Sequence, residues 1–360
     1  MGKAGRGDGR HITAGKMTDI REISKFLKDY DGPEIRIMEI CGSHTGAIAK
    51  NGIPGILSEK IKLISGPGCP VCVTPSAYID RLIEISRSGN HTVVTFGDLL
   101  RVPGSKCSLQ EAAGASYKMV YSPLDIIELA KDEPERTFVF AAIGFETTTP
   151  VYALLMQTLI EEKIKNVKIL TALKTMPEVV DLLCSSGAGI DAFIAPGHVC
   201  VITGSDIFKP AAEKYSLPFV VSGFEAEDLL STLYLLVKNR GKGVVINNYP
   251  AVVSAEGNKK AQELIDKYFE KTDASWRGIG NVPRSGRCLR TEYAEYDAGS
   301  KGLDHDEKIN KACSCDKVIM GKLSPEQCPL FGKVCTPSTP QGACMVSPEG
   351  SCSTQYEYGS

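Results

Sequence analysis

The sequence predicts an α/β protein with two α/β domains and a small, loop-rich metal domain at the C-terminal end. From about residue 35, short β-branched runs alternate with amphipathic stretches, which is typical of βα units on a largely parallel sheet. The alternation ends at about residue 270, where Cys, Gly and Pro become more frequent. A length of 360 residues exceeds the usual size of one domain, and a hydrophobic fraction of 42% is sufficient for a sizeable core.

The first α/β domain is expected to cover residues 17–132. Strands are predicted at 35–40, 62–65, 92–96 and 118–122. Helices fit residues 76–88 and 123–132, because Ser or a Ser-Pro pair at the start of each favours N-capping. Residues 1–16 are rich in Gly and Lys and are expected to form a disordered tail, after which Met17, a candidate natural start, opens a helical pattern.

The second α/β domain is expected to cover residues 133–265. Its predicted strands are 137–145, 168–173, 191–196 and 218–224. Its predicted helices are 150–163, 177–186 and 225–240. Residues 266–360 are expected to form the third domain, without strands.

Charge and hydropathy exclude several classes of partner. The net charge is −2, and Lys and Arg are spread along the chain, so we expect no nucleic-acid partner. No apolar run approaches the roughly 18 residues of a membrane span, and the first 16 residues lack the apolar core of a signal peptide. The expected location is the cytoplasm, without a membrane partner.

Thirteen cysteines are many for a reducing compartment, where thiols more often bind metals or carry redox chemistry. Cys41 in ICGSHT follows a predicted strand, at the edge where α/β sheets bind ligands. With His44, it suits a transition metal or a thiol-imidazole pair, although a structural cysteine and a surface histidine fit the motif equally well. Four scattered cysteines are expected to be ordinary thiols: Cys107, Cys184, Cys200 and Cys288.

The second candidate site is the C-x-x-C pair Cys69 and Cys72 in SGPGCPVCVTPS. The pair precedes a Ser-capped helix, and such thiols suit disulfide exchange or metal ligation. If the strands before Cys41 and before this pair are parallel, three thiols emerge at one edge, within reach of one metal ion. The alternative is a Pro-rich turn with two inert cysteines.

The third candidate site is a series of six cysteines near the C-terminus: Cys313, Cys315, Cys328, Cys335, Cys344 and Cys352. The gaps are 14 residues from Cys313 (or 12 from Cys315) to Cys328, then 6, then 16 to Cys352. These gaps are too wide for a zinc ribbon, and four thiolates in loops suit a [4Fe-4S] cluster. Structural zinc is the alternative. The first ligand is either Cys313 or Cys315, and Cys344, inside the last gap, is a candidate bystander.

Long motifs occur in one order along the whole chain. They include MEICGSHT, ISGPGCPVCVTP, FGDLLRVPGS, IGFETTTP, APGHVCVITG, VVSGFE, WRGIGNVPRSG, CPLFGKVCTP and CMVSPEGSC. Together they resemble the HypD family of hydrogenase maturation factors, and the resemblance covers residues 17 to 358. One departure is Gly46, where members of the family often have a second histidine.

The resemblance implies two Rossmann-like α/β domains facing each other and a third domain that holds a [4Fe-4S] cluster. The family's central cleft contains cysteines that match Cys41, Cys69 and Cys72, which are proposed to hold iron or to undergo thiol redox chemistry. The positions carried over as catalytic candidates are Cys41, His44, Cys69, Cys72, Asp98, Glu146 and His198. The expected cluster ligands come from Cys313, Cys315, Cys328, Cys335 and Cys352.

The resemblance also implies partners and a cargo. The family acts with HypC in a complex that carries Fe(II) with its cyanide and carbon monoxide ligands. HypE supplies the cyanide, and the hydrogenase large subunit is reached indirectly. The expected function is therefore that of a scaffold and redox protein for the Fe(CN)2CO centre of [NiFe]-hydrogenase.

In our mechanistic hypothesis, the cluster relays electrons to Cys69 and Cys72, while Cys41 and one or both of those thiolates hold Fe(II). Glycines in both turns leave room for the iron's ligands, and His44 donates a proton or hydrogen bond to bound cyanide. The main rival is a cluster-linked disulfide reductase resembling ferredoxin-thioredoxin reductase. A second rival is a zinc-stabilised binding module without a redox role.

Overall fold

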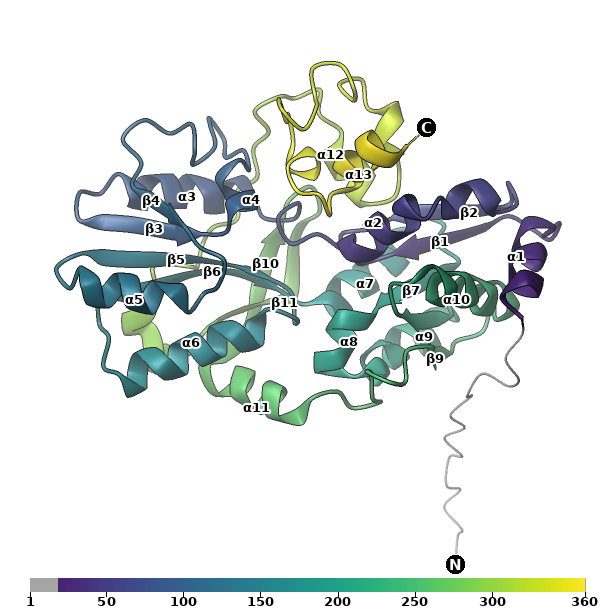
Figure 1. Ribbon diagram of the computed structural model, residues 1–360, viewed down its shortest axis with the longest axis horizontal. Coiled ribbons are helices and arrows are strands. Elements are labelled where there is room, and N and C mark those ends of the chain that lie inside the picture. Colours follow the sequence, from purple (N-terminus) through teal and green to yellow (C-terminus); the bar gives the residue numbers. More distant parts are fainter. Residues whose placement is uncertain (1–18, 360) are drawn as a thin grey trace, which may run out of the picture.

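The computed structural model of the protein describes residues 19–359 (Figure 1). The expected disordered tail 1–16 and the candidate start Met17 lie outside these residues. The described chain forms a mixed α/β structure with two sheets, each dominated by parallel strands. None of its helices has the length and apolar character needed to cross a membrane.

The first sheet, here called the all-parallel sheet, has five strands in the order β2-β1-β7-β8-β9. Every neighbouring pair in it is parallel. Its strands are β1 (Ile35–Glu39), β2 (Ile61–Ser65), β7 (Ala192–Pro196), β8 (Phe219–Ser222) and β9 (Val245–Asn247). The predicted parallel pairing of the first two strands is confirmed, with Ile35 opposite Ile61 and Glu39 opposite Ser65.

The second sheet, here called the mixed sheet, has six strands in the order β10-β11-β6-β5-β3-β4. Its strands are β3 (His91–Thr95), β4 (Tyr117–Met119), β5 (Thr137–Gly144), β6 (Val167–Lys174), β10 (Phe269–Trp276) and β11 (Gly280–Leu289). The first four pair in parallel, whereas the hairpin β10-β11 adds antiparallel strands next to β6. The expectation that strands end before residue 270 is therefore wrong.

The chain passes back and forth between the two sheets. It leaves the all-parallel sheet after β2, returns after β6, and leaves again after β9. Neither sheet is confined to residues 17–132 or 133–265, so the expected domain boundary does not coincide with the sheets. Local periodicity identifies each strand, but the partner of a strand depends on which apolar faces pack together.

Helices cover both faces of each sheet, as parallel strands require. One face of the all-parallel sheet packs on α1 (Ile20–Lys28), α2 (Gly42–Lys50) and α10 (Ala226–Lys238). The mixed sheet packs on α5 (Asp125–Asp132), α6 (Thr149–Glu161) and α11 (Lys259–Tyr268). The inner core, which joins both sheets, includes α3 (Ser76–Ser86), α7 (Met176–Ser185) and α9 (Lys209–Tyr215). Two further short helices follow strands: α4 (Gly97–Leu100) and α8 (Gly197–Thr203).

The C-terminal segment lies across the junction of the two sheets, in yellow in Figure 1. After the 3-10 turn Thr291–Tyr296 it contains only short helices: α12 (Cys315–Ile319), Pro325–Gln327, Ala343–Met345 and α13 (Ser351–Tyr358). The remaining 3-10 turns of the described chain are Ile53–Ile56 and Ser205–Phe208. The cysteine side chains of this segment, except that of Cys328, belong to the inner core, which brings them beside the ends of both sheets.

Candidate functional site

The turn after β1 and the turn after β2 are packed against each other. Cys41 precedes α2 with an extended backbone (φ −147°, ψ 120°), and the Gly42 N–H donates to the Gly68 carbonyl at 3.0 Å. A Cβ atom at position 68 would lie 2.3 Å from the Cys41 nitrogen, so only glycine fits there. This glycine permits backbone contact, and it does not leave the space for metal ligands that we expected.

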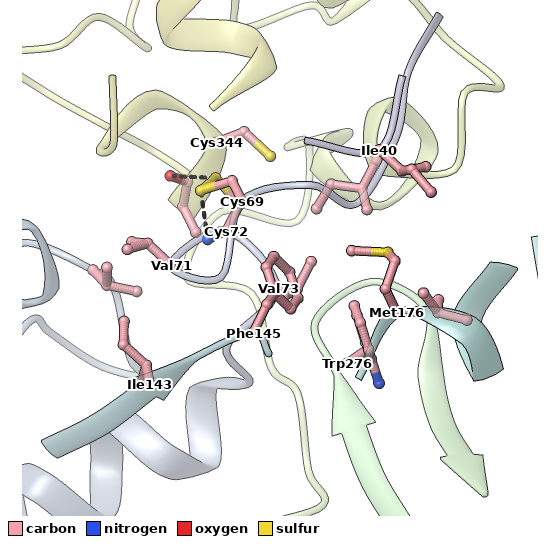
Figure 2. Close-up of a cluster of buried hydrophobic side chains, with 14 of the residues drawn as sticks. Ile40, Cys69, Val71, Cys72, Val73, Ile143, Phe145, Met176, Trp276 and Cys344 are labelled. Atoms are coloured by element: carbon pink, nitrogen blue, oxygen red, sulfur yellow. Dashed lines mark hydrogen bonds between the residues drawn. A yellow bond between two sulfur atoms is a disulfide. The ribbon is translucent and has the colours of Figure 1, made fainter. Parts of the chain in front are cut away.

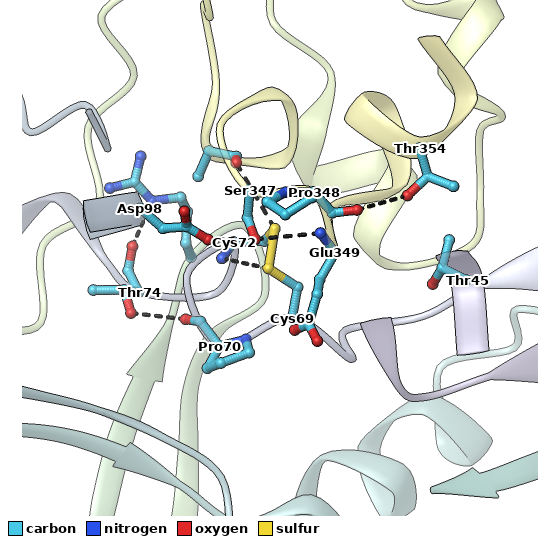
Figure 3. Close-up of a disulfide and its surroundings, with 12 residues drawn as sticks. Thr45, Cys69, Pro70, Cys72, Thr74, Asp98, Ser347, Pro348, Glu349 and Thr354 are labelled. Atoms are coloured by element: carbon cyan, nitrogen blue, oxygen red, sulfur yellow. Dashed lines mark hydrogen bonds between the residues drawn. A yellow bond between two sulfur atoms is a disulfide. The ribbon is translucent and has the colours of Figure 1, made fainter. Parts of the chain in front are cut away.

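Cys69 and Cys72 form a disulfide in the turn between β2 and α3 (Figure 3). Their Cα atoms are 5.3 Å apart, and the side chains are only 4% and 3% exposed. The Cys72 sulfur lies 3.8 Å from the Ala343 carbonyl, and Cys344 lies beside the pair (Figure 2). The disulfide is therefore sealed beneath the C-terminal segment, and only its reduction releases two thiolates for a metal.

The Cys41 thiol is not part of a disulfide. Burial raises its pKa to about 12, and the nearby carboxyl groups of Glu349 and Glu39 contribute in the same direction. Cys41 is therefore protonated at neutral pH. A metal that binds here has to displace the proton.

Two carboxyl groups beside Cys41, the buried Glu39 and the half-buried Glu349, were not predicted from the sequence. The Glu39 carboxylate accepts from the Cys41 N–H at 3.0 Å and from the Thr45 hydroxyl at 2.5 Å, and burial raises its pKa to about 8. Glu349 accepts from the Ser43 hydroxyl at 3.0 Å, and burial raises its pKa as well. The position of Glu39 at the end of a predicted strand could have indicated its role. No such signal existed for Glu349, because it lies near the other end of the sequence.

His44 is fully buried, so the alternative interpretation of a surface histidine is wrong. Its Nε2 lies 3.0 Å from the Gly223 carbonyl, which can only accept, so Nε2 carries the hydrogen. Nδ1 is then an acceptor that has no partner within residues 19–359. Burial lowers the pKa of His44 to about 4. The ring is therefore neutral at pH 7, and the expected proton or hydrogen bond from His44 to bound cyanide stays a prediction. The His44 ring stacks on Phe224, whose ring also contacts the exposed His198 at a centroid distance of 4.1 Å.

Asp98 and Glu146 follow strands of the mixed sheet. Asp98 accepts from the Ser347 hydroxyl at 3.2 Å and lies close to the disulfide (Figure 3). Glu146 accepts from the Met176 N–H at 2.8 Å with one oxygen, while its other oxygen has no hydrogen-bond partner in the described part of the chain. Burial raises the pKa of Glu146 to about 7.

Cys200, which we expected to be an ordinary thiol, is fully buried on α8. Burial raises its pKa, and negative charge on Glu146 and Cys41 adds to the effect. Cys200 belongs to the inner core, together with Cys69, Cys72 and Phe145. Its spacing from the other cysteines contained no signal of this placement.

All six C-terminal cysteines are buried, and all of them except Cys328 belong to the inner core. The sulfurs of Cys313 and Cys315 are 3.3 Å apart, and a Cβ on Gly342 would lie 2.5 Å from the Cys315 sulfur. Interactions with Cys315 raise the pKa of Cys344 and lower that of Cys352. This group of cysteines therefore contains thiols close enough to share protons, and Cys344 is as deeply buried in it as the expected ligands.

Comparison with known proteins identifies the family. Residues 16–359 match the HypD family model, described as "Hydrogenase formation hypA family". The chain belongs to the HypD family. A hydrogenase maturation factor HypD of Azotobacter vinelandii is 42% identical to this chain. The match covers 91% of this chain and 90% of the relative. HypD of Escherichia coli is 40% identical, over 94% of this chain and 93% of the relative. A putative hydrogenase expression/formation protein of Methanocaldococcus jannaschii is 41% identical, over 94% of this chain and 96% of the relative.

The donors in the C-terminal segment fit the [4Fe-4S] cluster that we expected for a HypD protein. They are buried thiols in loops, and such a cluster is held by four cysteine thiolates. Across residues 19–359, no three His, Cys, Asp or Glu side chains stand in position to hold a metal ion. Binding therefore requires the hydrogen-bonded sulfurs of Cys313 and Cys315 to move apart, and burial alone does not distinguish Cys344 from the ligands.

Proposed function

We propose that this HypD-family chain is a scaffold and redox protein for the Fe(CN)2CO centre of [NiFe]-hydrogenase, acting with HypC and HypE. One observation carries the proposal. The buried Cys69–Cys72 disulfide lies between the Cys41 turn and the C-terminal cysteines, in contact with both segments. Such a disulfide can receive electrons from the side of the C-terminal cysteines, and its reduced thiolates can then bind a metal on the side of Cys41.

The cargo site in this proposal is made by Cys41 and the reduced pair Cys69 and Cys72. Reduction of the disulfide takes two electrons and two protons and yields two thiols. These thiols and Cys41 then lose protons to bind Fe(II), because thiolates are soft ligands suited to iron that carries cyanide and carbon monoxide. His44, with its free Nδ1 acceptor, supports the turn without acting as an acid.

The electron source in this proposal is a [4Fe-4S] cluster held by Cys328, Cys335, Cys352 and either Cys313 or Cys315. When bound, such a cluster supplies electrons one at a time. Cys344 lies beside the disulfide (Figure 2) and interacts with Cys315 and Cys352, so it connects the disulfide with the proposed cluster site. The electrons originate from an external one-electron reductant.

The disulfide beside the thiol cluster also favours the rival function, a [4Fe-4S]-linked protein disulfide reductase. The two functions differ in their product. A reductase turns over partner disulfides, whereas a scaffold retains iron with diatomic ligands.

The deciding experiment is anaerobic co-purification with HypC, followed by metal counting and infrared spectroscopy. The scaffold predicts iron beyond that of the cluster, with cyanide and carbonyl stretching bands in the complex. Catalytic reduction of a partner disulfide without these bands would establish the reductase. Zinc in place of iron and acid-labile sulfide would overturn both functions.

A further inference from the structure

Arg277 is a buried cation in the turn between β10 and β11. It is 8% exposed, although an arginine is rarely buried unless its charge is paired. Its guanidinium donates to the carbonyls of Thr74 at 2.5 Å and Pro103 at 2.7 Å, and its N–H donates to the Val73 carbonyl at 2.8 Å. Val73 and Thr74 directly follow the disulfide (Figure 3), so the charge is fixed beside the disulfide turn.

The same residue also lies against the C-terminal cysteine cluster. A Cβ on the neighbouring Gly278 would lie 2.7 Å from the Asp316 Cα, in the first turn of the helix that begins at Cys315. Burial lowers the pKa of Arg277, while Asp306, Cys315, Cys344 and Cys313 oppose that effect. Arg277 is thus held between the two groups of sulfurs.

The charge of Arg277 is only partly neutralised. Asp306 is the carboxylate that faces it, at 3.8 Å from Nε. The oxygens of Asp306 are already engaged by the N–H groups of Ser76 at 3.2 Å and Gly278 at 2.9 Å. In a low-dielectric interior, a fixed positive charge stabilises a neighbouring centre more strongly after that centre gains negative charge.

We propose that the positive charge of Arg277 raises the reduction potential of the centre held by the C-terminal cysteines. Arg277 does so without binding the centre, by stabilising the added electron through its fixed charge. Asp306 lowers this reduction potential, because its negative charge offsets part of the effect of Arg277. This inference rests on the proposed cluster.

The test is a redox titration of anaerobically reconstituted full-length protein, with dithionite as the one-electron reductant and the reduced cluster measured by electron paramagnetic resonance. Arg277→Gln is expected to lower the equilibrium constant for reduction at least tenfold, which is a shift of about 59 mV for one electron. Arg277→Lys, which retains the charge, is expected to shift it less. Asp306→Asn is expected to shift it in the opposite direction.

The matched control is Lys333→Gln, which removes the same charge two residues from Cys335 but at an exposed position. Solvent screens that charge, so its variant should keep the wild-type potential. Equal potentials for Arg277→Gln and Lys333→Gln would overturn the inference. If Arg277→Gln does not fold, Asp306→Asn decides: a higher potential supports the inference and an unchanged one overturns it. Wild-type protein without iron and sulfide would refute the proposed function, and with it the inference.

Discussion

The three cysteines beside the all-parallel sheet and the six cysteines of the C-terminal segment are both held in turns, but the turns are stabilised differently. The Cys41 and Cys69–Cys72 turns are tied to paired strands, and the contact of Gly68 with the Cys41 backbone locks them together. The C-terminal cysteines lie in residues 297–359, which contain no strand in the described chain. The first group has a geometry that does not depend on a metal, whereas the second depends on contacts between its own sulfurs.

The largest expected effect is the loss of the cluster when one of its cysteine ligands in the C-terminal segment is replaced. Cys328→Ala and Cys335→Ala should each lose essentially all of the roughly four irons of the cluster and loosen the segment, because metal binding there is coupled to folding. Iron and acid-labile sulfide analysis and visible absorption measure the loss. Cys344→Ala is the control and should retain the brown colour. An intact cluster in the Cys328 or Cys335 variant would contradict the ligand assignment.

The second prediction concerns the independence of the two groups. Cys41→Ala, Cys69→Ala and Cys72→Ala proteins should remain folded and keep the cluster, because strands and not sulfurs hold their turns. They should nevertheless fail to support hydrogenase maturation, measured as hydrogenase activity in a complemented deletion strain. In wild-type protein, thiol counting should show reversible opening of the disulfide. Loss of iron from all three variants would show that the two groups form one site.

The third prediction tests whether His44 holds the Cys41 turn or acts as an acid. His44→Ala should reduce the free energy of unfolding by about 1–3 kcal/mol, because the buried Gly223 carbonyl loses its donor, and should slow maturation. Chemical denaturation measures the first effect. His198→Ala, in the exposed ring of the same stack, should stay within about 0.5 kcal/mol of wild type. Slow maturation at unchanged stability would instead support a role in proton transfer.

The smallest expected effect, taken per pH unit, is a pH dependence of stability from Glu39. Burial raises its pKa from 4.5 to about 8, so between these values the folded chain keeps a proton that the unfolded chain has lost. The contribution of Glu39 to stability is complete below pH 4.5 and is lost as the pH rises toward 8, by at most about 1.4 kcal/mol per pH unit.

Glu39→Gln should remove this slope, since an amide does not titrate. Chemical denaturation across this pH range measures it, and the same substitution at the exposed Glu59 is the control. An equal slope in wild-type and Glu39→Gln proteins would assign the pH dependence to other groups.

Much of the fold followed from local patterns. The strands at 35–40, 62–65, 137–145 and 218–224 and the helices at 76–88 and 225–240 were predicted to within a few residues of their observed bounds. The parallel pairing of the first two strands brought Cys41 and the C-x-x-C pair to one edge, as expected. The hairpin 269–289 escaped notice because its glycines, proline and charges interrupt the alternation that marks a strand.

The sequence by itself determined the family, most of the secondary structure and the set of candidate cysteines and histidines. Tertiary structure alone decided which strands share a sheet, that Glu39 and Glu349 face Cys41, and that His44 is a neutral acceptor. It also decided that Arg277 lies between the two groups of sulfurs. The reason is physical: element formation depends on neighbours within a few residues, whereas pairing, burial and protonation depend on groups that meet only when distant apolar faces pack.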